Sequence, residues 1–135
     1  MTQQQAVLLR EVDLPSADRG NGATTARLVN RSCGSQSMIN GITTTPPRGA
    51  IPLRYHNCEE SVLVLSGTGV AVVGEIELAI KTIDVTRISN NLPHQFRNGS
   101  DTASMRIFWT YASAGATSTM VETGKTHLID AEHKA

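Results

Sequence analysis

The sequence predicts an all-β, single-domain protein built as a β-sandwich or a small antiparallel barrel. Short runs rich in valine, isoleucine and threonine recur along the chain, and glycine, proline, asparagine or serine separates them about every 8–12 residues. No segment shows a sustained apolar repeat of helical period. The length of 135 residues and the 39% hydrophobic content suit one core, and the 18% charged content lies outside the range typical of disordered chains.

Extended segments in the first half of the chain end at residues that interrupt a sheet. Pro15 stops the first segment, and Gly20-Asn21-Gly22 is typical of a loop within a domain. Pro46 and Pro47 end a later one, because proline has no backbone N–H to donate to a neighbouring strand. The predicted strands are Val7–Val12, Ala23–Asn30, Met38–Thr45 and Ile51–His56.

The second half of the chain predicts a hairpin followed by further short strands. Ser66–Gly69 is a tight-turn signal between two β-branched runs. In the last core segment, Met105, Ile107 and Trp109 should share one face, because alternate residues of a strand point the same way. Beyond residue 111 we expect a short tail in which a helical turn is confined to Ile129–Lys134. The predicted strands are Ser61–Leu65, Val70–Val73, Glu75–Ile80, Val85–Ser89, a segment at Phe96, and Met105–Tyr111.

The charge balance argues against partners that bind through a strong positive electrostatic field, such as nucleic acid or an anionic membrane. Twelve lysines and arginines match twelve aspartates and glutamates, so the formal net charge is zero, and neither nucleic acid nor a membrane surface is an expected partner. Cys33 and Cys58 are too few for a disulfide framework, and the first residues do not resemble a secretory leader. We therefore expect a cytoplasmic protein.

His56, Glu60 and His94 form the constellation most capable of chemistry. An imidazole and a carboxylate four positions apart at a strand end can converge on one cation, and a second imidazole from a neighbouring strand completes the set. Two histidines and one carboxylate suit Fe(II) and tolerate Mn, Ni, Co or Zn. The competing interpretation is that these histidines are hydrogen-bonded structural groups, which is the commoner role for a histidine in a strand.

Two stretches resemble the motifs of the cupin superfamily. Arg48–Gly67 is similar to the first motif, G-x5-H-x-H-x3-4-E-x6-G, and Asp84–Asn98 is similar to the second, G-x5-P-x-G-x2-H-x3-N. The resemblance implies a small jelly-roll β-barrel, commonly dimeric, with any metal inside it. It implies one cupin domain over 1–135, with the motif-bearing barrel at 48–111, N-terminal strands at 6–30 and a tail at 112–135. Matched residue by residue, it assigns His56, Glu60 and His94 as metal ligands.

Arg54 is the main departure from the family pattern, because it stands where the first motif has its first histidine. A guanidinium has no lone pair for a metal, so at most three of the usual ligands remain. Arg54 can grip a carboxylate or phosphate of a substrate with two parallel hydrogen bonds, or its charge can weaken cation binding. The sequence leaves both alternatives open.

Other departures fall where the family has glycine or proline. Arg48 and Asn91 stand at or beside glycine positions, Ser89 replaces proline, and Ile83 replaces the glycine before Asp84. Asparagine tolerates a positive φ, but a β-branched residue there is strained. We therefore expect the turn at Ile83 to have a different geometry from the family turn.

Several neighbouring residues have structural interpretations that outweigh functional ones. We expect Cys58, Trp109 and Phe108 to fill the core. Tyr55 and Asn57 should point away from a pocket shared by Arg54 and His56, whose strand parity Cys58 also has. The remaining candidates are Glu59, which the family spacing disfavours against Glu60, and the tail histidines His127 and His133, expected in solvent.

Two classes of function fit this combination. In the first, His56, Glu60 and His94 hold a divalent metal (Fe(II), Mn, Ni or Zn), and Arg54, Glu60 and His94 take part in oxygenase, decarboxylase, lyase or isomerase chemistry on a small anionic or carbonyl substrate. In the second, a metal-free pocket binds a small molecule or acts as an epimerase- or cyclase-type acid–base catalyst.

A homodimer is expected from the resemblance and because the segments 6–12 and 23–30 can cover a partner's sheet edge.

Overall fold

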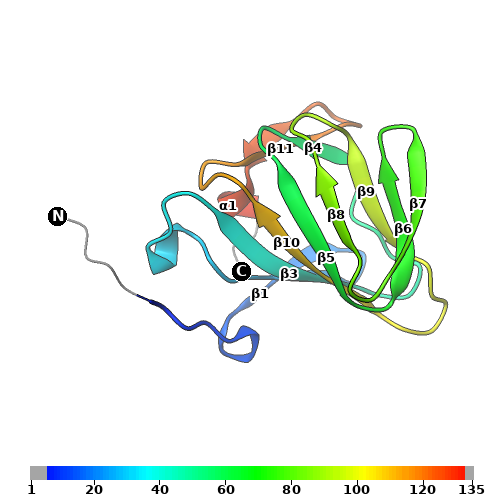
Figure 1. Cartoon of the computed structure of the whole chain (residues 1–135), viewed down its shortest axis with the longest axis horizontal. Coiled ribbons are helices and arrows are strands. Elements are labelled where there is room, and N and C mark those ends of the chain that lie inside the picture. Colours follow the sequence, from blue (N-terminus) through cyan, green and yellow to red (C-terminus); the bar gives the residue numbers. More distant parts are fainter. Residues whose placement is uncertain (1–5, 133–135) are drawn as a thin grey trace.

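Two six-stranded sheets face each other in a computed structural model that describes residues 6–132 (Figure 1). All the strand pairs within the two sheets are antiparallel, so the predicted all-β jelly-roll barrel is confirmed. Among the described residues, no helix is long and apolar enough to cross a membrane.

The first sheet has the order β1-β2-β3-β10-β5-β8. Its central strand β10 pairs with β3 on one side and with β5 on the other. The strands are β1 (Ser16–Gly20), β2 (Ala23–Arg27), β3 (Ile39–Thr45), β10 (Met105–Tyr111), β5 (Glu60–Ser66) and β8 (Val85–Ile88).

The second sheet has the order β12-β11-β4-β9-β6-β7. Its strands are β12 (Thr126–Leu128), β11 (Thr117–Met120), β4 (Arg54–His56), β9 (His94–Asn98), β6 (Thr68–Val73) and β7 (Ile76–Lys81). The helical pieces are the 3-10 turns η1 (Glu11–Asp13) and η2 (Arg31–Cys33) and the single turn α1 (Ile129–Glu132).

Strand alternation builds the core between the sheets. Along β10, Met105, Ile107, Trp109 and Tyr111 are buried, while the residues between them are partly exposed. This is the face that the sequence predicted for the first three of these residues. Gly41 of β3 leaves room for the core, because a Cβ there would lie 2.6 Å from the indole of Trp109.

The predicted first strand, Val7–Val12, is wrong. Residues 6–10 have no regular structure, η1 follows, and the first strand is instead Ser16–Gly20. Asn21 has a φ of 53° and lies between two positive-φ glycines in the turn that joins this strand to β2. The polar segment Ser16–Gly20 therefore pairs with β2. The more apolar segment Val7–Val12 pairs with no other strand among the described residues, and Val12 is 87% exposed.

The predicted C-terminal tail forms part of the barrel. β11 pairs with β4, and β12 pairs with β11, which extends the second sheet beyond the strand that carries Arg54 and His56. Ile129 begins α1, as predicted for the helical turn, and is fully buried. The end of the predicted turn, at residues 133 and 134, lies outside the described residues.

The turn at Ile83 corrects another expectation. Ile83 adopts a φ of 77°, and Arg48 and Asn91 adopt 60° and 63°, so all three take the left-handed conformation that suits glycine. The Ile83 N–H donates to the carbonyl of Val64 at 2.8 Å, and the Asp84 carboxylate accepts from the Lys81 N–H at 2.9 Å. These hydrogen bonds hold the tight turn between β7 and β8 despite the strain of a β-branched residue.

Candidate metal centre and pocket

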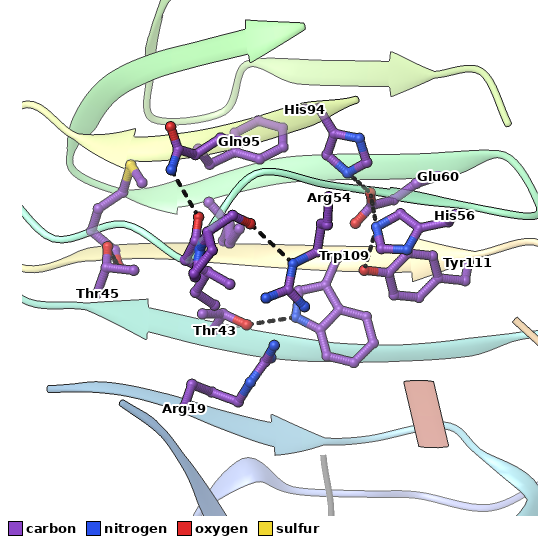
Figure 2. Close-up of a pocket in the computed structure, with 15 residues that line it drawn as sticks. Arg19, Thr43, Thr45, Arg54, His56, Glu60, His94, Gln95, Trp109 and Tyr111 are labelled. Atoms are coloured by element: carbon purple, nitrogen blue, oxygen red, sulfur yellow. Dashed lines mark hydrogen bonds and ion pairs between the residues drawn. The ribbon is translucent and has the colours of Figure 1, made fainter. Parts of the chain in front are cut away.

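His56, Glu60 and His94 converge between the two sheets (Figure 2). They come from the end of β4, the start of β5 and the start of β9, and their relative exposures are 3%, 5% and 4%. The Nε2 of His94 lies 2.9 Å from Oε1 of Glu60, and the Nε2 of His56 lies 3.6 Å from the same oxygen. The ligand atoms of all three residues lie within 4.8 Å of one another.

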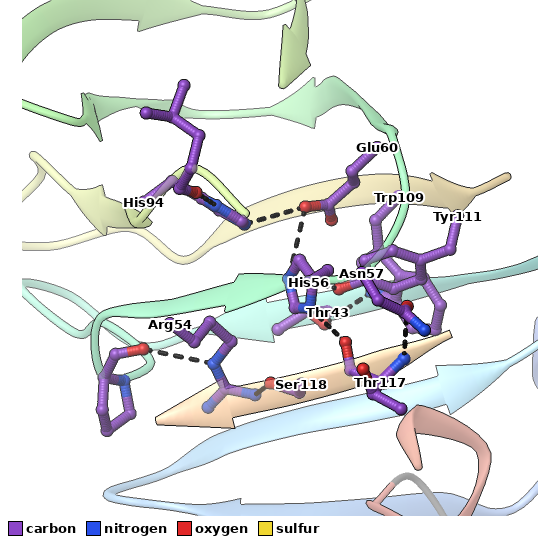
Figure 3. A network of polar contacts seen from close by, with 12 residues as sticks. Thr43, Arg54, His56, Asn57, Glu60, His94, Trp109, Tyr111, Thr117 and Ser118 are labelled. Atoms are coloured by element: carbon purple, nitrogen blue, oxygen red, sulfur yellow. Dashed lines mark hydrogen bonds and ion pairs between the residues drawn. The ribbon is translucent and has the colours of Figure 1, made fainter. Parts of the chain in front are cut away.

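Backbone carbonyls determine which nitrogen of each histidine carries the proton. His56 Nδ1 lies 3.1 Å from the carbonyl oxygen of Thr117, and His94 Nδ1 lies 2.8 Å from that of Leu92 (Figure 3). A carbonyl oxygen only accepts, so each Nδ1 carries the hydrogen and donates it. In its neutral form, each imidazole then presents a lone pair on Nε2 toward Glu60.

Glu60 therefore has an unsatisfied oxygen. Its Oε1 is buried and has no hydrogen-bond donor in the described structure, although the Nε2 of His94 lies within ion-pair distance. When both imidazoles are neutral, their Nε2 atoms offer lone pairs beside the carboxylate, an arrangement that a cation satisfies. Two ligands bound to one metal at about 2.1 Å lie about 3.0–3.4 Å apart. The two imidazole nitrogens lie 2.9 and 3.6 Å from Oε1 of Glu60, close to this range. The residues thus fit a divalent metal.

The local electrostatics keep His56 neutral. Burial lowers the pKa of His56 to about 4, and the attraction of Glu60 only partly opposes this effect. The positive charges of His94, when protonated, and of Arg54 lower the pKa further. At neutral pH the imidazole therefore keeps the lone pair that metal binding requires.

Tyr111 is a site residue that the sequence analysis missed. Its hydroxyl lies 3.3 Å from Nε2 of His56, and the two rings meet edge to face with centroids 4.7 Å apart. The register explains the contact, because Tyr111 of β10 is paired with Glu60 of β5. The alternation of β10 contained the signal, since Tyr111 follows Met105, Ile107 and Trp109 on the same face.

Arg54 lies at the wall of the same pocket, on the side of β4 that also carries His56. It is paired in register with His94 of β9. Its Nε donates to the carbonyl of Pro52 at 3.2 Å, and its Nη1 lies 3.5 Å from the hydroxyl of Ser118. The guanidinium is thereby held beside the candidate metal ligands.

The remaining candidates lie apart from the pocket lining, with one exception. Trp109 belongs to the core and lines the pocket as well, whereas Cys58 packs against the core elsewhere, and burial raises the pKa of its thiol. Asn57 accepts from the Thr117 N–H, and Glu59 pairs with Arg87 at the surface. His127 is exposed on β12, and His133 lies outside the described residues.

The pocket has apolar walls and a polar end. The side chains of Ile51, Phe96, Met105, Ile107 and Trp109 form much of its lining (Figure 2). The other lining residues are Arg19, Thr43, Thr45, Pro52, Arg54, His56, Glu60, His94, Gln95 and Tyr111. This arrangement suits a small molecule with an apolar body and a few oxygen atoms.

Comparisons with known proteins agree with this architecture. The family model described as a cupin domain matches residues 41–111 of the 135. Protein SchB of Streptomyces halstedii is 28% identical over 109 residues, which cover 80% of this chain and 79% of that protein.

Two solved structures share the fold at low sequence identity. The polyketide cyclase RemF from Streptomyces resistomycificus aligns with a TM-score of 0.69 at 17% identity, over 79% of each chain. Bacillus subtilis oxalate decarboxylase, in a study of its Mn(II) centers, aligns with a TM-score of 0.74 at 14% identity, over 83% of this chain and 31% of that one. Because the cupin match spans both motifs and most of the strands that carry the site, the chain belongs to the cupin family.

Proposed function

We propose that this cupin is a divalent-metal-dependent enzyme in which His56, Glu60 and His94 hold the metal. The buried Glu60 oxygen that lacks a hydrogen-bond donor carries this proposal. Leaving a carboxylate buried beside two imidazole lone pairs costs several kcal/mol unless a positive charge compensates it. Bacillus subtilis oxalate decarboxylase, which shares the fold, is described as having Mn(II) centers.

The proposed substrate is a small carbonyl compound with an apolar or aromatic body. The walls formed by Phe96, Ile107 and Trp109 favour such a body over a small dianion such as oxalate. RemF, which shares the fold, is named as a polyketide cyclase, and a polyketide combines carbonyl oxygens with a carbon chain that can close into rings. Ring closure on a polycarbonyl substrate is therefore the reaction type that we favour.

The chain's own residues would perform three tasks in such a reaction. A bound divalent cation would supply Lewis acidity toward a substrate oxygen. Tyr111 lies where its hydroxyl can donate a hydrogen bond to the same substrate, and Arg54 lies where it can orient an anionic group. The apolar walls exclude water, which strengthens each of these polar interactions.

The competing function is a metal-free pocket that binds a small molecule or acts through proton transfer by Glu60 and His94. Metal analysis of untagged protein separates the two. We expect about one equivalent of a divalent transition metal, and a large loss of metal in each of His56→Ala, Glu60→Gln and His94→Ala. His127→Gln, on exposed β12, is the matched control and should retain the metal. Absence of metal after reconstitution with Mn, Fe(II), Ni and Zn would favour the metal-free alternative.

Location and assembly belong to the proposal as well. Cys33 and Cys58 are both free thiols in the structure, as suits a reducing cytoplasm. The proposed partners are a small-molecule substrate and a second copy of the chain, without nucleic acid or a membrane.

A further inference from the structure

Arg19 reaches the pocket from the edge strand β1. The register shifts between Asp18, opposite Thr24, and Gly20, opposite Ala23, so Arg19 has no directly opposed residue. Arg19 shares the inward parity of the buried Ala17 and extends from β1 toward Trp109 (Figure 2).

A row of buried polar side chains holds Arg19 in place. Its Nη1 donates to the hydroxyl of Thr25 at 3.3 Å, and this hydroxyl lies 2.9 Å from that of Thr43. The indole N–H of Trp109 donates to the Thr43 hydroxyl at 2.8 Å. Thr25 and Thr43 are 1% and 2% exposed, so the row is shielded from water and runs across β1, β2, β3 and β10. Arg19 is thereby preorganised at the pocket wall.

Arg54 borders the same pocket from the opposite sheet. The residues that line the pocket thus include two guanidinium groups and one carboxylate, Glu60, which faces the two histidines. With a divalent cation at those histidines, the side chains that line the pocket include more positive than negative charges. Such a field in a partly desolvated pocket favours an anion.

We propose that Arg19 and Arg54 form an anion-binding subsite that takes a carboxylate of the substrate, while its carbonyl end faces the candidate metal centre. The inference rests on the proposed function for the orientation of the substrate. The subsite itself depends only on the two arginines and the walls. Guanidinium groups bind carboxylates through paired, charge-assisted hydrogen bonds, and Phe96, Ile107 and Trp109 offer an apolar surface to an attached ring. The substrate class is therefore an aromatic or polycarbonyl carboxylic acid.

Benzoate and its neutral isostere benzamide test the subsite directly. Trp109 is the only tryptophan of the chain and lines the pocket, so its fluorescence reports occupancy. Both ligands are titrated into the protein as purified and again after chelation of metal, which removes direct binding of carboxylate to a cation. We expect benzoate to bind at least about tenfold more tightly than benzamide in both states.

Variants assign that preference to the two arginines. Arg19→Gln and Arg54→Gln should each weaken benzoate at least about fivefold and leave benzamide unchanged. Arg87→Gln, an exposed arginine paired with Glu59 on the outer surface, is the matched control and should bind benzoate like the wild type. Metal content should be the same in Arg19→Gln as in the wild type.

The outcomes separate this inference from the proposed function. A preference for benzoate that survives in Arg19→Gln, or that disappears on chelation, would overturn the subsite. If the protein holds no metal as purified or after reconstitution, a preference that depends on both arginines would support the subsite and refute the metal-dependent function. Equal binding of benzoate and benzamide in the wild type would overturn the subsite whatever the metal content.

Discussion

The carbonyl oxygens of Thr117 and Leu92 give the two site histidines their chemical character. By accepting the Nδ1 hydrogens, they leave both Nε2 lone pairs facing the carboxylate of Glu60. Hydrogen bonds of this kind also orient the rings and increase their basicity toward a metal. A ligand set of three side chains thus depends on backbone groups from β11 and from the loop before β9.

Acid should destabilise the metal-free protein through His56. Burial lowers the pKa of folded His56 to about 4, whereas the unfolded side chain titrates near 6.5. The free energy of unfolding is therefore highest above about pH 6.5, where His56 is neutral in both states. It decreases as the pH falls toward 4, because the unfolded state binds the proton more readily than the folded state. The loss is on the order of 3 kcal/mol over this window.

Denaturant titrations of chelated protein between these pH values measure this effect. His56→Gln lacks the titrating group, so its free energy of unfolding should depend less steeply on pH than that of the wild type. Parallel pH profiles for the two proteins would show that His56 does not titrate in this way.

Ile83 offers a stabilising substitution at the same scale. It is 70% exposed and has a φ of 77°, so it contributes strain without much burial. Ile83→Gly should raise the free energy of unfolding by about 0.5–1 kcal/mol, since relief of strain exceeds the added entropy of the unfolded glycine. Thermal unfolding checks this, with Asn91→Gly as the control expected to gain less. A lower melting temperature for Ile83→Gly would contradict the strain argument.

At the scale of elements, β11, β12 and α1 complete the wall behind His56. β11 pairs with β4 at Ser118 and His56, and the Ile129 N–H donates to the carbonyl of Ala116 at 3.0 Å. The C-terminal segment therefore packs into the core, although its sequence is mostly polar. Its contribution to stability should be concentrated in the buried side chain of Ile129.

Truncation of that side chain provides the test. Ile129→Ala should cost about 2–5 kcal/mol, because it leaves a cavity under the end of the second sheet. The neighbouring Leu128 is 53% exposed, so Leu128→Ala should cost much less. Chemical denaturation of the two variants compares them directly, and equal losses would show that α1 does not dock as described.

At the scale of the whole molecule, the homodimer stays a prediction, and its structural basis has changed. β2 lies inside a sheet between β1 and β3, so it is not available to a partner. β1 is the edge strand instead, and the exposed Val7, Leu8 and Val12 precede it. An unpaired edge beside exposed apolar side chains is a typical surface for association.

Light scattering measures the assembly. We expect a particle of twice 14.5 kDa at micromolar concentration, and Val12→Asp should shift it toward the monomer because a charge would be buried at the contact. The matched control, Ile76→Asp, alters an exposed apolar residue on β7, the distant edge of the other sheet, and should stay dimeric. A 14.5 kDa particle for the wild type would refute the dimer.

Most strand positions and most of the site could be predicted because they depend on local patterns. Alternation in Met105–Tyr111 specifies its buried face. The predicted hairpin at Ser66–Gly69 is wrong, because the chain passes there from one sheet to the other: β5 pairs with β10 and β8, whereas β6 pairs with β7 and β9. The motif spacing places His56, Glu60 and His94 at the ends of three strands that the barrel brings together. Such patterns can be read from sequence because the geometry of a strand repeats every two residues.

Other features depended on contacts between segments that are distant in the chain. The apolar Val7–Val12 has the composition of a strand but no partner strand in the described part of the chain, whereas the polar Ser16–Gly20 pairs through its turn. Arg19 reaches the pocket from an edge strand far from the other site residues in sequence, and Thr117 accepts a hydrogen bond from His56 across 61 residues. Local composition specifies whether a segment can be extended, but strand pairing decides which atoms meet, because each backbone group is satisfied only by the neighbour that folding provides.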